Sequence, residues 1–254
     1  ESKTLDSASR PLTPRFGLSF QADERNLYYG SIAKGVRGSG VADAEGARCL
    51  EDGAAIGFDP LVPREVRPDS LWSYELGSKN RLWNGRLDVD FAIYHVEWKD
   101  VQDSLTLPVC QLATTLNLGT AQSDGADLAL SLQPLPSLSL GIAASYVDAR
   151  YTTDLPGPAD TITRRKGEPL NVAPWSWHMS AQYTMALGSH ELYARGDYSH
   201  TSENTTALDL GSPLVDPDIP RTPPTSQLDV RAGWRLKDFD ISLFVDNVLG
   251  DHPV

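Results

Sequence analysis

The chain has 254 residues, of which 40% are hydrophobic and 22% are charged, and its formal net charge at pH 7 is −12. No apolar run approaches the roughly 18 residues that a membrane-spanning helix needs, which excludes helical spans. The acidic balance argues against nucleic acid as a partner, because binding to phosphates needs a basic surface.

Alternation of apolar and polar residues with a period of two recurs along the chain, and it indicates β-strands with one apolar and one polar face. The segment "RLDVDFAI" (86–93) places leucine, valine, phenylalanine and isoleucine on one face and two aspartates on the other. The pattern breaks between Tyr94 and Trp98, which we interpret as a β-bulge or as the end of the apolar layer. The segment "WSWHMSAQYTM" (175–185) alternates almost without error.

Amphipathic helix patterns are absent, so the sequence predicts an all-β chain, an antiparallel up-and-down meander of long strands. About ten strands are expected, near residues 15–22, 26–37, 71–82, 86–103, 111–133, 138–152, 174–186, 190–202, 225–236 and 239–247.

The connections between these strands alternate in kind. Five are tight turns with suitable residues, at 23–25, 83–85, 134–137, 187–189 and 237–238. The others include three long segments, 38–70, 153–173 and 203–224, and a shorter one at 104–110. Short turns on one edge of a sheet and long loops on the other edge are typical of outer-membrane barrels, with the turns periplasmic and the loops extracellular.

Strand length and aromatic placement favour lipid as the cover of the apolar face. About 11 tilted residues cross the ~25 Å apolar band of an outer membrane, whereas soluble strands average about 5–6 residues. Trp175 and Trp177 stand at the long-loop end of their strand and Tyr183 near the short-turn end. We expect one lipid-facing side to carry these tryptophans together with Leu128, Leu130, Leu138, Leu140, Leu192, Leu228 and Val230. The alternative is a soluble β-rich binding or adhesion module with tryptophan in its core.

Four segments, taken in order, resemble the C-terminal barrel region of TonB-dependent outer-membrane receptors. They are "LTPRFGLSFQADERNLYYGSIAKGVRGSG", "SYELGSKNRLWNGRLDVDFAIYHVEWKDVQ", "LNLGTAQSDGADLAL" and "LFVDNVLGDHPV". The family often has Glu where this chain has Asp127. The plug domain, the TonB-engaging segment and a last strand ending in an aromatic residue have no counterpart here. The resemblance therefore implies that residues 1–254 are a partial barrel, strands twelve to twenty-one of the 22 in such transporters.

The resemblance implies TonB-dependent uptake of a scarce solute, such as a ferric siderophore or another metal chelate. The implied partners are the TonB complex, through the missing plug segment, and outer-membrane lipid. A passive porin-type barrel is the alternative with the same fold. The charged positions Arg195, Asp197, Asp229, Arg231 and Arg235 are candidates for lining the lumen. A plainer interpretation is that these side chains pair across strands or with the plug.

No catalytic set, metal site or cofactor site is found, and the chain is not expected to be an enzyme. The five histidines lack ligand spacing, and "HEL" at His190 lacks the second histidine of a zinc helix.

The two cysteines, Cys49 and Cys110, lie in loops on the same, extracellular edge of the expected sheet. An even cysteine count in an exported protein favours a disulfide, which would join the two loops over the barrel mouth. The alternatives are that both are unpaired, or that one pairs with a cysteine elsewhere in the receptor.

Overall fold

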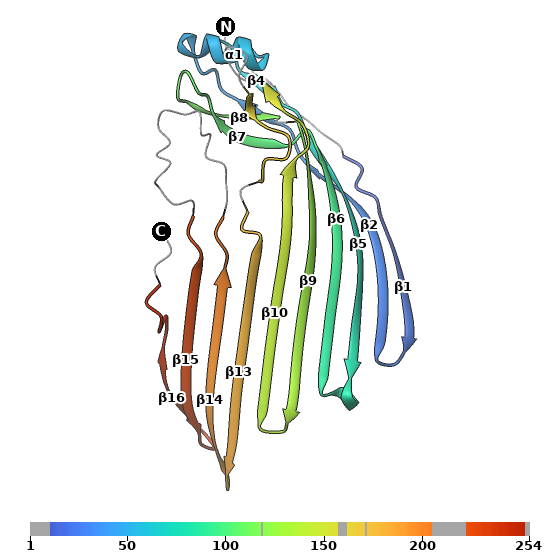
Figure 1. The fold of residues 1–254 in the computed structure, drawn as a ribbon, viewed down its shortest axis with the longest axis vertical. Helices are drawn as coiled ribbons and strands as arrows, with labels where there is room; N and C mark the ends of the chain where they lie inside the picture. Colours follow the sequence, from blue (N-terminus) through green and yellow to red (C-terminus); the bar gives the residue numbers. More distant parts are fainter. Residues whose placement is uncertain (1–10, 118, 157–161, 171, 205–221, 252–254) are drawn as a thin grey trace.

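The structure, a computed structural model, describes residues 11–117, 119–156, 162–170, 172–204 and 222–251. Within them the main element is one ten-stranded antiparallel sheet in which neighbours in sequence are neighbours in space (Figure 1). Its strands are β1 (Arg15–Asp23), β2 (Asn26–Arg37), β5 (Asp69–Leu82), β6 (Leu87–Lys99), β9 (Thr120–Leu135), β10 (Leu138–Tyr151), β13 (Trp175–Leu187), β14 (His190–Thr201), β15 (Thr225–Arg235) and β16 (Asp240–Val245).

The expected meander is confirmed, with β1 and β16 at the two ends of the sheet. The barrel is not closed within this chain. Tight turns join the strands at one edge, the lower edge in Figure 1, and the longer connections lie at the opposite edge. We call these the turn end and the loop end. Of the long segment expected at 203–224, residues 205–221 lie outside the described residues.

The loop end carries small additional elements that alternation did not predict. They are the strands β3 (Gly40–Ala42), β4 (Arg64–Val66), β7 (Gln102–Thr106), β8 (Ala113–Asn117), β11 (Leu155–Pro156) and β12 (Ile162–Arg164), and the helix α1 (Leu50–Ile56) after a 3-10 turn, Ala47–Cys49. The strands expected at 86–103 and 111–133 are therefore each divided in two, and the hairpin β7–β8 lies between β6 and β9. The expectation of no helix was wrong for α1, which at seven residues is too short to show an amphipathic period.

The expected bulge between Tyr94 and Trp98 is also wrong. The pairing of β6 with β5 and with β9 runs without a register shift from Leu87 to Lys99. The register agrees with the other interpretation, the end of the apolar layer, because His95 and Glu97 occupy apolar-face positions opposite Asp124 and Gln122 of β9. Trp98 in turn lies on the polar face, so the two faces exchange character here without a bulge. Register shifts occur instead near the turn end, at Gln21 to Asp23 and at Leu138 to Leu140.

Tyrosine rings lie over cross-strand glycines at three places on the polar face. The pairs are Tyr29–Gly77, Tyr94–Gly125 and Tyr193–Gly233, each directly opposite in register. A Cβ placed on Gly125 would lie 2.2 Å from the Tyr94 ring and 2.7 Å from the Tyr146 carbonyl oxygen. The glycine is thus required because the tyrosine covers the exposed backbone in place of a side chain.

Gly125→Ala should therefore destabilise the sheet, by about 1–3 kcal/mol, because the ring and backbone must move to admit the methyl group. Gly196→Ala in β14 is the matched control, since a Cβ there meets no atom within 4 Å. Urea unfolding of the two variants should separate them. Equal stabilities would mean that the tyrosine moves aside at no cost.

Candidate membrane wall and loop layer

The two faces of the sheet differ in chemistry, as the sequence predicts. One face, here called the apolar face, exposes large hydrophobic side chains along the sheet: Leu18 is 79% and Leu243 is 83% exposed. The cross-strand register places all nine leucine, valine and tryptophan positions named above on this face. Other exposed members are Phe16, Ile32, Tyr74, Leu76, Phe91, Ile93, Ile142, Met179, Met185, Ile241 and Val245. No second sheet covers these residues in the part of the chain that the structure describes.

Aromatic side chains of the apolar face gather toward its two ends. At the loop end the Tyr146 and Trp175 rings are 4.6 Å apart, and the Trp177 ring stacks on His200 at 4.4 Å. Toward the turn end stand Phe20, Tyr28, Tyr183, Trp234 and Phe239, all exposed. Two aromatic bands with aliphatic residues between them are what a strand crossing a bilayer requires, because amphipathic rings prefer the interfaces.

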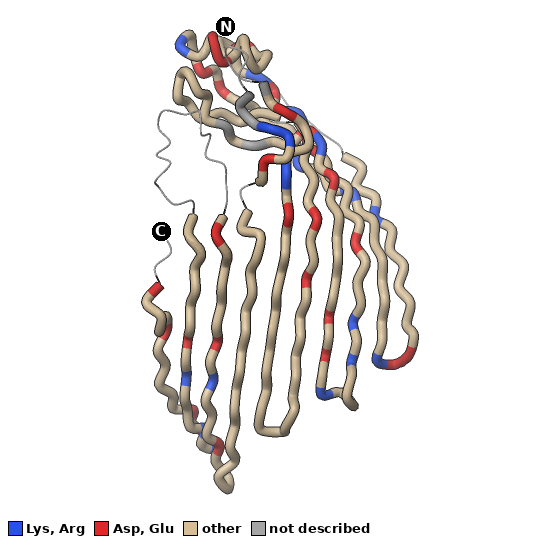
Figure 2. The backbone as a smooth tube through the Cα atoms, viewed as in Figure 1, with Lys and Arg blue, Asp and Glu red and all other residues tan. Residues whose placement is uncertain are grey.

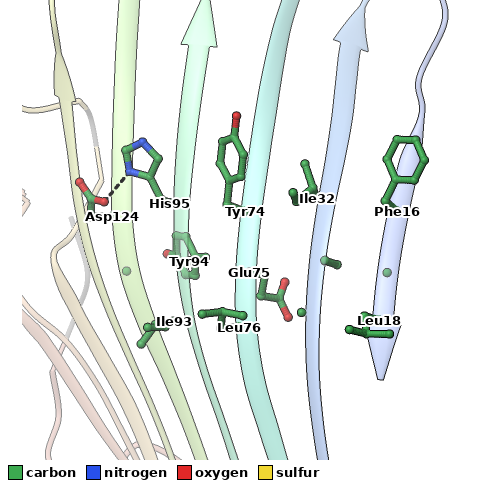
Figure 3. Close-up of a pocket in the computed structure, with 14 residues that line it drawn as sticks. Phe16, Leu18, Ile32, Tyr74, Glu75, Leu76, Ile93, Tyr94, His95 and Asp124 are labelled. Carbon is green, nitrogen blue, oxygen red and sulfur yellow. Dashed lines mark hydrogen bonds and ion pairs between the residues drawn. The ribbon is translucent and has the colours of Figure 1, made fainter. Parts of the chain in front are cut away.

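A groove of about 790 Å³ crosses the apolar face over β1, β2, β5, β6 and β9 (Figure 3). Its walls are mostly apolar, including Phe16, Leu18 and Ile93. At its loop-end rim the His95 Nδ1 lies 2.6 Å from a carboxylate oxygen of Asp124. His95 and Asp124 thus satisfy each other's polar groups where the apolar layer ends, since the next positions of this face, Glu97 and Gln122, are polar too.

The opposite face, here called the polar face, carries all five charged residues singled out in the sequence. Arg195 donates two hydrogen bonds of 2.6 Å to Asp197, two residues along the same strand. Arg235 forms ion pairs with Glu191 at 2.5 Å and with Asp240 at 3.4 Å. These contacts agree with the plainer interpretation of the charges, pairing within the wall.

The other two of the five, Asp229 and Arg231, each lie opposite a residue of the same charge on the neighbouring strand. Asp229 lies opposite Asp197 and accepts hydrogen bonds from the Gln227 amide and from the Asn247 N–H. Arg231 lies opposite Arg195, and its guanidinium is 5.6 Å from the centroid of the Phe244 ring. Neither Asp229 nor Arg231 forms an ion pair among the described residues, so these two of the five keep a charge that a further group on this face can meet.

Arg195→Ala should cost less than about 1 kcal/mol in free energy of unfolding. The Arg195 side chain is 44% exposed, and exposed ion pairs contribute little because water solvates the separated charges well. Chemical denaturation measures the change. A loss of several kcal/mol would mean that the pair is buried against another part of the receptor.

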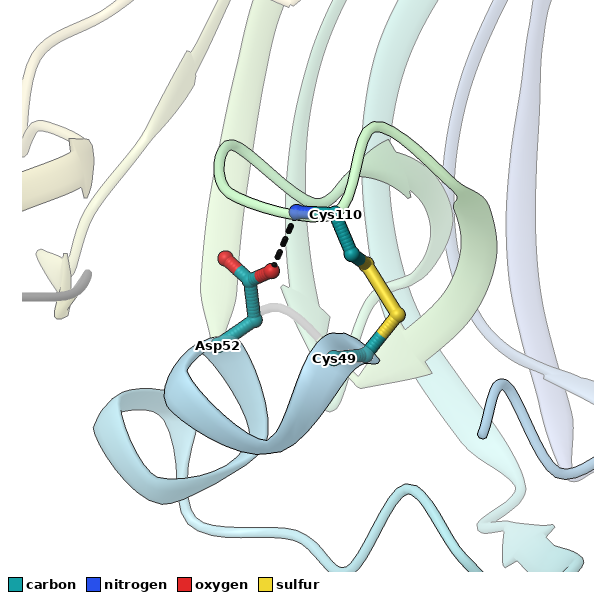
Figure 4. A group of neighbouring side chains, drawn as sticks. All are labelled: Cys49, Asp52 and Cys110. Atoms are coloured by element: carbon teal, nitrogen blue, oxygen red, sulfur yellow. Dashed lines mark hydrogen bonds between the residues drawn. A yellow bond between two sulfur atoms is a disulfide. The ribbon is translucent and has the colours of Figure 1, made fainter. Parts of the chain in front are cut away.

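The loop-end elements form one packed unit, here called the loop layer, which comprises residues 40–66 and 101–117. Cys49 and Cys110 are joined by a disulfide with a Cα–Cα distance of 5.1 Å (Figure 4). Asp52 of α1 is fully buried beside it and accepts hydrogen bonds from the Val109 N–H, at 3.1 Å, and the Cys110 N–H, at 2.9 Å. The carboxylate thus satisfies two backbone groups of the β7–β8 connection next to the covalent link.

A second buried contact holds the layer together. Arg64 donates to both oxygens of the nearly buried Glu45 carboxylate, at 2.8 and 3.0 Å, and to the Thr114 hydroxyl at 2.6 Å. The same guanidinium lies 4.1 Å from the centroid of the Phe58 ring. Nη1 thus binds the carboxylate, Nη2 binds the hydroxyl, and the guanidinium lies over an aromatic ring, which holds the Arg64 side chain in one position.

The loop layer packs on the upper end of the polar face. Val101 and Leu116 are buried against Ala121 of β9 and Tyr151 of β10, with Trp98 of β6 beside them. Ala121 lies opposite Trp98 on one neighbouring strand and opposite Tyr151 on the other. These three residues share the face of Tyr94 and Gly125, which is the polar face. Because of these contacts, the loop layer lies over the polar side of the wall. Charged residues are frequent in the loop layer and at the upper ends of the strands (Figure 2).

Cys49, Asp52 and Cys110 also form the one group of three potential metal ligands found among the described residues. Both sulfurs are bonded to each other and Asp52 is engaged by backbone N–H groups, so the arrangement serves as a cross-link rather than a metal centre. Sequence reasoning missed Asp52, because nothing local distinguishes it from the other acidic residues of the loop. No helix in the described part of the chain is long and apolar enough to cross a membrane.

Comparison with known proteins assigns the family. The family model described as "TonB dependent receptor-like, beta-barrel" matches residues 2–248. The metal-pseudopaline receptor CntO of Pseudomonas aeruginosa is 31% identical over 145 residues, which is 57% of this chain and 18% of that protein.

Solved structures share the fold. The ferric yersiniabactin uptake receptor FyuA from Yersinia pestis superposes with a TM-score of 0.65 at 17% identity, over 92% of this chain and 32% of that one. BauA, the ferric preacinetobactin receptor from Acinetobacter baumannii, gives a TM-score of 0.61 at 17% identity, over 93% and 32%. The chain thus spans about a third of the length of these structures. With the family model covering nearly its whole length, the chain belongs to the TonB-dependent receptor β-barrel family, which consists of transport receptors and not enzymes.

Proposed function

We propose that residues 1–254 form part of the barrel wall of an outer-membrane receptor that takes up a metal chelate by TonB-dependent transport. The observation that carries the proposal is the exposed apolar face bounded by two aromatic bands, with the loop layer on the opposite face. In this arrangement the apolar face contacts lipid, the polar face lines the lumen and the loop end is extracellular.

The cargo class is inferred from the relatives. CntO is named as a metal-pseudopaline receptor, and FyuA and BauA as receptors for ferric complexes. Large, dilute solutes do not pass a passive pore at useful rates, so tight binding at the mouth must be followed by driven release. In the complete receptor the plug and the remaining strands complete the lumen, and Arg195, Asp197, Asp229, Arg231 and Arg235 face them.

Uptake of a radiolabelled metal chelate by cells with and without the receptor gene tests the proposal. Uptake should require both the receptor and the proton gradient. The matched control is a strain that has the receptor but lacks TonB, which should bind the chelate and fail to import it. Import that persists without TonB would support the passive barrel, and recovery of the receptor in the soluble fraction would support the binding module.

A further inference from the structure

The described chain passes four times between the wall and the loop layer. The first connection follows β2 at Gly38, the second precedes β5 at Arg67, the third follows β6 at Asp100, and the fourth runs to β9 from Asn117. Because β2, β5, β6 and β9 are consecutive neighbours in the sheet, the four connections leave it side by side. Any movement of the loop layer against the wall must therefore involve all four of them.

Gln102, at the start of β7, ties three of these connections together. Its side-chain amide donates to the Gly38 carbonyl at 2.9 Å and to the Arg67 carbonyl at 2.7 Å. Both partners are carbonyl oxygens, so only the amide nitrogen can face them. Since Gln102 itself ends the third connection, one side chain joins that connection to the first and the second.

Asn117, at the end of β8, ties the second, third and fourth connections together. Its amide nitrogen donates to the Arg67 carbonyl at 2.9 Å and to the Asp100 carbonyl at 2.8 Å. Its amide oxygen accepts a 2.9 Å hydrogen bond from the Arg67 N–H. The Val101 N–H also donates to the Gly119 carbonyl at 3.0 Å, which joins the third connection to the fourth. Each connection is thus bonded to at least one of the others.

A buried carboxylate of the wall holds this junction from below. Asp69, the first residue of β5, is 2% exposed and accepts a 3.1 Å hydrogen bond from the Gln102 backbone N–H. Arg37, the last residue of β2, donates from Nε to the same carboxylate at 3.1 Å, and its guanidinium also donates to the Gln102 carbonyl. The base of the loop layer is therefore bonded to the ends of two wall strands as well as across its own connections.

We infer that Gln102 and Asn117 are positioning residues, which hold the loop layer as a fixed overhang above the lumen and not as a lid. A lid turns on a few residues that change φ and ψ together, whereas movement of this layer would break bonds in all four connections at once. The disulfide joins the two loops at the opposite end of the β7–β8 hairpin, so the layer is held at both ends. The inference rests on the proposed function only for placing this overhang at the mouth, where it would present a preformed surface to the solute.

The distance between the loop layer and the wall tests the inference. Spin labels are attached to Arg48→Cys in the loop layer and Thr201→Cys at the loop end of β14, two exposed positions, with the native disulfide intact. The complete receptor in phospholipid vesicles should give one narrow distance distribution by pulsed electron paramagnetic resonance. Two populations, or a distribution as broad as that of a free loop, would show lid movement and overturn the inference.

Removing the two amides should release the layer. In Gln102→Met with Asn117→Leu, which keeps side chains of similar size, we expect the distance distribution to become roughly twice as wide. Exchange of the Val101 amide hydrogen should rise roughly tenfold or more, because each lost hydrogen bond makes the junction open more often. Gln111→Met is the matched control, since the Gln111 amide donates to the Pro108 carbonyl within a single loop. It should change neither quantity.

Hydrogen exchange in α1 separates positioning from a general contribution to folding. The Gly57 N–H donates to the Gly53 carbonyl at 2.8 Å inside the loop layer, so it should stay protected in the double variant. Loss of that protection would mean that the amides fold the layer and do not position it, which would overturn the inference, as would an unchanged distance distribution. Both results leave the proposed function standing, because TonB-dependent uptake is measured separately. A narrow distribution in a receptor that is recovered in the soluble fraction would reject the proposed function alone.

Discussion

Leu130→Lys should destabilise the receptor in lipid by about 2–4 kcal/mol, the cost of a lysine near the middle of the lipid-facing band of a barrel. Leu130 lies on the apolar face opposite Val89 and Ile142, between the two aromatic bands. A charge at this position would have to leave water for hydrocarbon or distort the bilayer around it. Folding into phospholipid vesicles at a series of urea concentrations measures the loss.

Ala129→Lys supplies the control for this prediction. Ala129 is the adjacent residue of the same strand, so it lies on the other face from Leu130 at nearly the same depth. It lies opposite Asp90 on the polar face, where an added ammonium group meets water and a carboxylate. We expect a change within about 0.5 kcal/mol. Equal penalties at both positions would contradict the assignment of lipid to the apolar face.

Removing the disulfide by Cys49→Ser with Cys110→Ser should destabilise the loop layer by about 2–5 kcal/mol. The link closes a loop of 61 residues in sequence separation, and opening it adds conformational freedom mainly to the unfolded ensemble. The effect should be local, because β5 and β6, which lie within that loop, are held by their own backbone pairing. Hydrogen exchange should therefore increase in residues 40–66 and remain unchanged in β6 and β9.

The wild-type receptor treated with a reductant should show the same increase in exchange, and the double variant should not respond to the reductant. That comparison separates loss of the covalent link from any effect of the serines themselves. Asp52→Asn provides a further comparison, because it keeps the disulfide and weakens the hydrogen bonds to Val109 and Cys110. Exchange that stays slow in all three cases would mean that packing on Trp98 and Tyr151 is sufficient to hold the layer.

The sequence alone determined the wall of this protein. Alternation with a period of two is a property of neighbouring residues, so it identified the long strands and sorted their side chains between two faces before any pairing was known. The turn residues at 23–25 and 187–189 and the long segments between other strands determined the meander and its two unlike edges. The positions expected on one face, from Leu128 to Val230, do share a face.

The tertiary structure decided which residues from distant parts of the chain meet. His95 appeared to interrupt a strand, but Asp124 of the neighbouring strand lies opposite it and accommodates its polarity without a bulge. Whether Cys49 meets Cys110, with Asp52 buried beside the disulfide, depends on how the loop layer packs on the wall. Local pattern carries no such information, because these contacts join residues about 30 to 60 positions apart through a fold that must form first.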